Sequence, residues 1–153
     1  MVDLNVIAEK LKQLSLRIAK VRALYSPDLD ELAAPNDTLD LLSFNLFLAV
    51  QTCVDLATHL ISDESWEPTA TAREAFERLE AHGVISHETV RALRQAVGFR
   101  NIVAHGYGGV DPALILTAAR TGLPDLERFA AELSAWLGRA PEPAGDFRPA
   151  TQM

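Results

Sequence analysis

The stretch TLDLLSFNLFLAVQTCVDLATHLIS, residues 38–62, decides the fold class. Its apolar residues recur at the spacing of an α-helix and cover most of the helix circumference. Too many polar or charged residues interrupt the run for a membrane-spanning segment. We therefore expect a long helix that is buried on most sides. The interrupting residues are Asp40, Asn45, Gln51, Asp55 and His59.

Helical periodicity continues on both sides of this stretch, and no segment has the alternation that is typical of β-strands. Breaks rich in proline, glycine and asparagine separate the helical patterns. We expect an all-α fold, a single-domain bundle of four to five helices over residues 1–137, with a flexible Pro-rich tail over 138–153. The sequence predicts helices over about 3–25, 38–62, 71–81, from 86 into residues 98–107, and 123–137, with short helical pieces or loops at 28–33 and 112–120.

The composition is that of a soluble globular protein, with 48% apolar and 23% charged residues among 153. The net charge of −7 makes the chain a poor non-specific binder of nucleic acid, so RNA has to be met at a local basic site. The single cysteine, Cys53, excludes an internal disulfide and lies in an apolar run, where it suits the core. Residues 1–14 carry Asp3 and no unbroken apolar segment, so we expect no signal peptide and a cytoplasmic location.

The segment GFRNIVAHGY, residues 98–107, carries the chemistry. Arg100 can hold and neutralise a phosphate, and His105 can move a proton near neutral pH, so the pair needs no metal to act on a phosphodiester. Asn101 and His105 share one helix face, while Arg100 lies about 140° round the axis and can reach back with its long side chain. The alternative is structural, with His105 and Asn101 capping carbonyls and Arg100 in a surface ion pair.

A polar stripe crosses the long apolar helix at Gln51, Asp55 and His59, which are four residues apart. Polar groups on such a helix need partners or water, so the stripe can orient Arg100 or His105. It can also be an inward hydrogen-bond network without chemistry, or a solvated strip. Two of its residues have the spacing of a metal pair, but two ligands do not make a site, and we expect no metal and no cofactor.

The motif RNIVAHGY, residues 100–107, resembles the R-x-x-x-x-H-x-Y pattern of HEPN-domain proteins of the HepT type, the toxin half of HepT–MntA bacterial toxin–antitoxin modules. The surrounding sequence is similar as well. QTCVDLATHLIS, residues 51–62, resembles the family's helix with glutamine and aspartate, and AFERLEAHGVIS, residues 75–86, followed by VGFRN, resembles its central portion. The resemblance covers roughly residues 4–137 and is more specific than the short motif alone.

The resemblance implies a HEPN-like all-α homodimer and a metal-independent RNase acting on tRNA or mRNA, whose two motifs meet at a cleft along the dimer interface. Arg100 would position the scissile phosphate, His105 would act as general acid or base, and Asn101 would help to place it. Tyr107 would accept AMP groups from an MntA-like nucleotidyltransferase antitoxin, which would silence the RNase. Gly106 departs from the pattern, because family members often carry an acidic residue there.

A second reading belongs to another class of protein. The chain can be a non-catalytic helical binding or nucleotide-binding subunit that assists a nucleotidyltransferase, since it is acidic and has no broad basic face. A third is a purely structural oligomerisation module. Expression alone should arrest growth under the first reading, with rescue by His105→Ala, and should be tolerated under the second.

Overall fold

The structure is a computed structural model that describes residues 2–32, 37–106 and 109–139. Within these ranges the regular structure is helical throughout, so the all-α prediction is confirmed. The described residues form five helices of 10 residues or more and one, α2, of 4 residues. In chain order the helices are α1 (Leu4–Leu24), α2 (Leu29–Leu32), α3 (Thr38–Asp63), α4 (Ala72–Ala81), α5 (His87–His105) and α6 (Pro112–Arg139).

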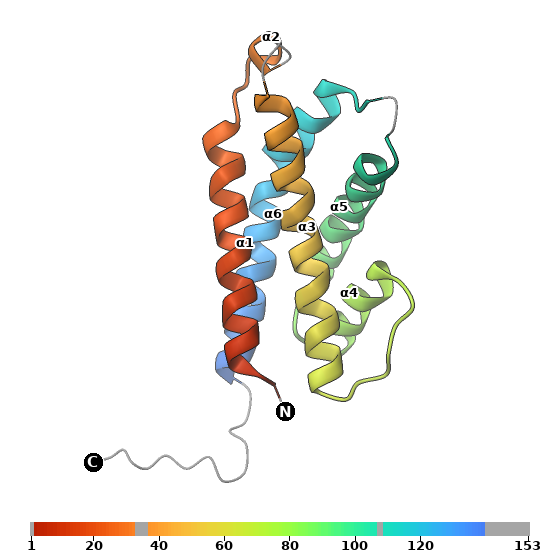
Figure 1. Cartoon of the computed structure of the whole chain (residues 1–153). Coiled ribbons are helices and arrows are strands. Elements are labelled where there is room, and N and C mark those ends of the chain that lie inside the picture. The colour runs from red at the N-terminus through yellow and green to blue at the C-terminus, as the bar shows by residue number, and fades with distance from the viewer. Residues whose placement is uncertain (1, 33–36, 107–108, 140–153) are drawn as a thin grey trace, which may run out of the picture.

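Helix α3 is the centre of the bundle and packs against α1, α4, α5 and α6. Figure 1 shows it between α1 and α5, with α6 behind. Its length and composition would be enough to cross a membrane, but it is the core helix of the bundle, with eleven residues buried by its neighbours. One of the eleven is Cys53, whose side chain is fully buried as predicted.

Several helices begin at a residue whose side chain satisfies free backbone N–H groups. The side chains of Asp3, Thr71 and Ser86 each accept a hydrogen bond from the first turn of α1, α4 and α5. After α4 the chain turns at Gly83, whose φ of +74° is in the left-handed region that favours glycine. These local signals fix where the central helices start and stop.

The start of α5 is held against α6 by polar contacts. Glu132 Oε1 accepts the Ser86 N–H at 2.9 Å, and Arg128 Nε donates to Thr89 Oγ1 at 2.9 Å. Burial alone would raise the pKa of Glu132, but hydrogen bonds from Ser86 and Thr89 and the charge of Arg128 outweigh it, so the pKa lies below its ordinary value. The N-terminal end of α5 is therefore fixed to the bundle.

The region 112–137 differs from the prediction of a short segment followed by a separate helix. The structure has one helix, α6, which continues through Pro124 and ends at Arg139. A proline inside a helix removes a hydrogen bond and costs about 3 kcal/mol. The apolar stripe of Ala119, Leu123 and Leu126 is buried without interruption across this point, so core packing offsets the cost. The predicted tail falls from residue 140 onward outside the described residues.

Candidate functional site

Residues 100–105 of the motif form the C-terminal end of α5, beyond the part of the helix that is buried. Val90, Leu93, Val97 and Phe99 anchor α5 in the core. No side chain from residue 100 to residue 106 is fully buried. The core thus fixes the helix, and the helix presents the motif at the surface.

Arg100 is partly buried and is held by amide groups. Its Nη1 donates to Gln51 Oε1 of α3 at 3.3 Å, while its Nη2 and Nε donate to Asn101 Oδ1 at 2.9 and 3.3 Å. Gln51 Nε2 in turn donates to Asp55 Oδ1 at 3.1 Å. We call these four side chains the arginine network; it joins the polar stripe of α3 to the motif of α5.

No carboxylate in the described parts of the chain comes within 4.0 Å of the Arg100 guanidinium. Several other arginines do have such partners; Arg22 pairs with Glu127, and Arg94 pairs with Glu77. A guanidinium held only by neutral groups keeps its full charge and its remaining N–H donors for an anion. Arg100 is therefore oriented without being neutralised.

His105 is the last residue of α5 and is exposed. Across the described residues its ring makes no hydrogen bond, and Asn101 is exposed one turn earlier. The Arg100 guanidinium bonds both to Gln51 of α3 and to Asn101, which shares the helix face of His105, so a reach of Arg100 toward the imidazole stays a prediction. The imidazole is left open to solvent and to a ligand.

His59, the third residue of the predicted stripe, is not part of the arginine network. Its Nε2 lies 3.2 Å from Asp63 Oδ2, within ion-pair distance but outside hydrogen-bond geometry. The same Asp63 oxygen accepts the Asp3 N–H at 2.8 Å. His59 thus belongs to the contact between the end of α3 and the start of α1, two turns from Gln51.

The segment after the motif is tightly packed at Gly106. A Cβ added there would stand 2.8 Å from Val110 Cγ2 and 2.9 Å from the Ile102 carbonyl oxygen. The Gly106 carbonyl also accepts the Gly109 N–H at 2.9 Å, which closes a turn. Glycine is therefore required by space in this conformation. Tyr107 lies outside the described residues, so its predicted accessibility stays a prediction.

Large apolar side chains are exposed on α3 and at the end of α5 that carries the motif. Leu41 and Phe44 of α3 are 49% and 55% exposed, and Ile102 of α5 is 49% exposed. Phe44 also lines a shallow hollow with Val103 of the motif. Clustered exposed apolar groups of this size are typical of a protein–protein contact.

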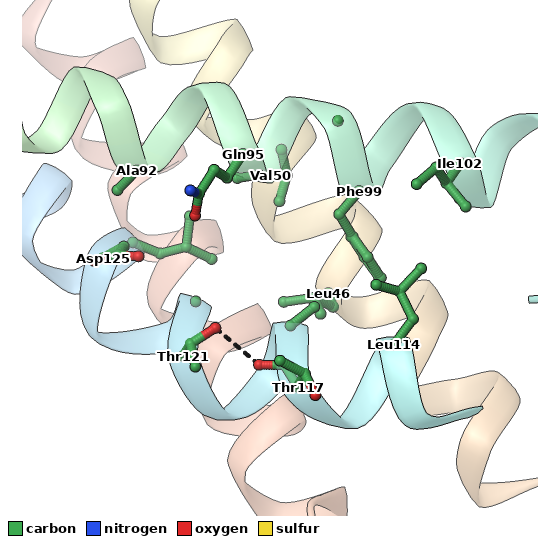
Figure 2. A pocket seen from close by; sticks show the side chains of 15 residues that line it. Leu46, Val50, Ala92, Gln95, Phe99, Ile102, Leu114, Thr117, Thr121 and Asp125 are labelled. Atoms are coloured by element: carbon green, nitrogen blue, oxygen red, sulfur yellow. Dashed lines mark hydrogen bonds between the residues drawn. The ribbon is translucent and has the colours of Figure 1, made fainter. Parts of the chain in front are cut away.

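A mainly apolar pocket of about 360 Å³ lies between α5 and α6, with α3 as its floor. Figure 2 shows Phe99 and Ile102 of α5 facing Leu114 of α6 across it, and Leu46 behind. Neither Arg100 nor His105 lines it, so the polar groups of the motif lie outside it. Sequence patterns did not reveal the pocket; its signal is the run of small residues on the facing helices, Ala92, Ala96, Gly98, Ala118 and Gly122.

In the described parts of the chain no three His, Cys, Asp or Glu side chains are grouped so as to hold a metal ion. What the site brings together is a fixed, unneutralised guanidinium and an exposed imidazole on one helix end. The class of protein is thus an all-α bundle with an Arg-x4-His motif at its surface. The sequence pattern of the family described as "Ribonuclease HepT-like" matches residues 5–133. The chain therefore belongs to the HepT-like HEPN ribonucleases, the toxins of toxin–antitoxin modules.

The chain is similar to curated relatives of this family at low identity. It is 22% identical to the mRNA nuclease HepT of Shewanella oneidensis over 125 residues, which cover 82% of this chain and 93% of the relative. It is 24% identical to the tRNA nuclease HepT of Aphanizomenon flos-aquae over 92 residues, which cover 60% and 63%.

Solved structures share the fold. The tri-AMPylated Shewanella oneidensis HEPN toxin, solved in complex with MNT antitoxin, has a TM-score of 0.77 at 23% identity, covering 88% of this chain and 99% of that one. YutE from Bacillus subtilis, a cytosolic protein of unknown function, has a TM-score of 0.80 at 14% identity, covering 95% and 98%. At these identities the likeness concerns the fold alone.

Proposed function

We propose that this protein is a cytoplasmic, metal-independent RNase toxin that cleaves RNA with Arg100 and His105 in a homodimer and is silenced by AMPylation of Tyr107. The observation that carries the proposal is the state of Arg100, which amides orient and no carboxylate of the described residues neutralises. Three other partly buried arginines, Arg78, Arg94 and Arg128, each pair with a carboxylate, and Arg100 does not. An arginine kept charged beside an exposed imidazole suits a phosphodiester.

Arg100 binds the scissile phosphate and stabilises the charge that develops on it during the reaction. Its planar donors match two phosphate oxygens, and the Gln51 amide fixes the plane of the guanidinium beforehand. Asn101 holds the other side of the same group. Preorganised donors of this kind act without rearrangement at the moment of reaction.

His105 transfers the protons. The ribose 2′-oxygen attacks phosphorus and loses its proton to a neutral imidazole, while the bond from phosphorus to the 5′-oxygen breaks and that oxygen receives a proton from an imidazolium. The products are a 2′,3′-cyclic phosphate and a 5′-hydroxyl. One imidazole cannot be neutral and protonated at once, so two copies of His105, one from each protomer, suit the two roles.

The homodimer is supported by the exposed apolar side chains Leu41 and Phe44 of α3 and Ile102 of α5, which a contact with a second copy would remove from water. A symmetric contact through this surface would bring the two motifs near each other. Two copies of Arg100 in one cleft also raise the local positive charge that an acidic chain otherwise lacks.

Regulation by an MntA-like nucleotidyltransferase antitoxin follows from the position of Tyr107, two residues after His105. The Shewanella oneidensis HEPN toxin was solved in a tri-AMPylated form in complex with MNT antitoxin. AMP groups on Tyr107 would place negative charge and bulk beside the phosphate site and compete with RNA for Arg100.

Cleavage of tRNA and mRNA by the purified, unmodified protein in EDTA tests the proposal. We expect cleavage by the wild type and loss of it in Arg100→Ala and His105→Ala, with Arg120→Ala on the exposed side of α6 as the matched control. Activity that requires added metal would overturn the mechanism. A protein that is inactive on both RNAs but binds the antitoxin or nucleotide would support the reading as a non-catalytic partner of a nucleotidyltransferase.

A further inference from the structure

Positive charge is concentrated on α1, although the chain as a whole is acidic. Residues 4–24 carry Lys10, Lys12, Arg17, Lys20 and Arg22 against Glu9, a net charge of +4 in a chain of net charge −7, which leaves −11 for the remaining residues. The bundle is therefore strongly polarised in charge, with one basic helix on an acidic body.

Three of these cations lie along one side of α1. Lys10, Arg17 and Lys20, with Gln13 between them, follow each other at intervals of three, four and three residues, which keeps them on one helix face. This basic stripe runs beside the buried stripe of the same helix. Its length is about 15 Å from end to end.

No carboxylate of the described residues pairs with the stripe. Lys10 and Lys20 make no ion pair there, and Arg17 donates only to the Asn45 amide, at 2.9 Å. By contrast, Arg22 on another side of the same helix makes a two-pronged pair with Glu127 of α6. As at Arg100, no carboxylate of the described residues offsets the positive charge of the stripe.

The stripe borders the same helix that orients Arg100. Because α1 and α3 are antiparallel, the Asp3–Asp63 contact and the Arg17–Asn45 contact set their register, and Lys10 falls level with about residue 54 of α3. Figure 1 shows α1 and α5 on the two sides of α3. Arg17 and Lys10 thus stand across α3 from Arg100.

We infer that Lys10, Arg17 and Lys20 form a binding surface for the RNA backbone, which guides a strand across α3 to Arg100. The inference rests on the proposed function, because it extends the same RNA site. Along the helix axis Lys10 lies about 10 Å from Arg17, and Arg17 lies about 5 Å from Lys20. A row of cations at such intervals suits the repeated phosphates of an RNA strand. A stripe that binds an acidic partner protein would be expected to consist of arginines held in fixed orientations. Two of these three residues are instead flexible lysines. We expect no preference for particular bases, because the proposed contacts are with phosphate groups only.

Binding of single-stranded RNA in the His105→Ala background, measured by fluorescence anisotropy over a range of salt concentrations, tests the inference. The test variant is Lys10→Gln/Lys20→Gln, and the control is Lys12→Gln/Arg120→Gln, which removes the same charge from other surfaces. Each lost phosphate contact lowers the salt slope by about 0.7, so we expect the test variant to lose about 1.4 and the control to keep the wild-type slope. With His105 restored, KM for cleavage should rise while kcat stays unchanged.

Equal salt slopes for RNA binding in the test and control variants, with intact binding by the wild type, would contradict the inference about the basic stripe. The RNase proposal would not be affected. Binding that falls alike in both variants would also overturn it, since only total charge would then matter. If the wild type neither binds nor cleaves RNA, both the RNase proposal and the stripe fail together. A test variant that keeps RNA binding but loses an acidic partner protein would reassign the surface to that partner.

Discussion

Moving one negative charge by a single helical turn tests whether Arg100 must remain unneutralised. The variant Gln51→Glu/Asp55→Asn keeps the net charge of the chain and replaces the amide acceptor of Arg100 by a carboxylate. The new group would stand where Gln51 Oε1 now stands, 3.3 Å from the guanidinium. The Asp55→Asn change removes the like charge that would otherwise lie beside it.

The expected loss follows from the charge interaction. Two unit charges at about 4 Å interact by about 4 kcal/mol at an effective dielectric constant of 20. Because Arg100 is partly exposed, we reduce the energy of the new ion pair to about 2–3 kcal/mol. The RNA phosphate has to replace this interaction in order to bind the guanidinium. A tenfold change corresponds to about 1.4 kcal/mol, so kcat/KM for RNA cleavage should fall about 30- to 150-fold.

Two single changes serve as controls for this variant. Gln51→Leu removes one hydrogen bond worth about 1 kcal/mol, so we expect a fall of about fivefold. Asp55→Asn leaves the direct contacts of Arg100 in place and should change cleavage less than threefold, a factor equal to about 0.6 kcal/mol. Thermal unfolding should show that all three variants remain folded. Wild-type cleavage by the charge-moved variant would refute the reasoning, because Arg100 would then work equally well when paired.

Other predictions concern stability and reactivity. Gly106→Ala should lower the free energy of unfolding by about 1–3 kcal/mol in urea titration, because the added Cβ would meet two atoms closer than 3.0 Å. Gly98→Ala is the control: its Cβ would enter open space, so the same titration should show a stabilisation of about 0.5–1 kcal/mol. Glu132→Gln should lower the free energy of unfolding by about 1 kcal/mol at pH 7. Because the pKa of Glu132 is lowered in the folded state, this loss of stability is present above the unfolded-state pKa near 4.3 and disappears as pH falls through the folded-state pKa. A pH-independent difference would contradict this cause. Cys53 is buried and its pKa is raised by desolvation, so a thiol reagent should label it only as fast as the protein unfolds, and rapid labelling of native protein would contradict its burial.

Periodicity in the sequence predicted the helices well, because the features that determine them are local. The apolar spacing of residues 38–62, the cap at Ser86 and the stop at Gly83 all act within one or two turns. The error at Pro124 has the opposite origin. Proline ends a helix by local rules, and only the buried stripe of α6, which depends on the neighbouring helices, overrides them.

The candidate site was only partly predictable for the same reason. Spacing placed Gln51 and Asp55 on one face of α3, but it could not decide which neighbour that face meets. Tertiary packing directs Arg100 to Gln51 and leaves His59 with Asp63. The roles of Arg100, Asn101 and His105 in catalysis remain predictions that the cleavage experiment tests.

The end of α5 from Arg100 to His105 contributes no fully buried side chain, and this has a consequence for how the protein can change over generations. Substitutions here alter the chemistry while the bundle keeps its stability, because core burial is the main source of folding energy. Cells that escape the toxin by mutating this helix end would retain a folded, inactive protein. In the proposed homodimer such a protein would assemble with wild-type copies, so a single inactive allele would weaken the toxin in a mixed population of chains.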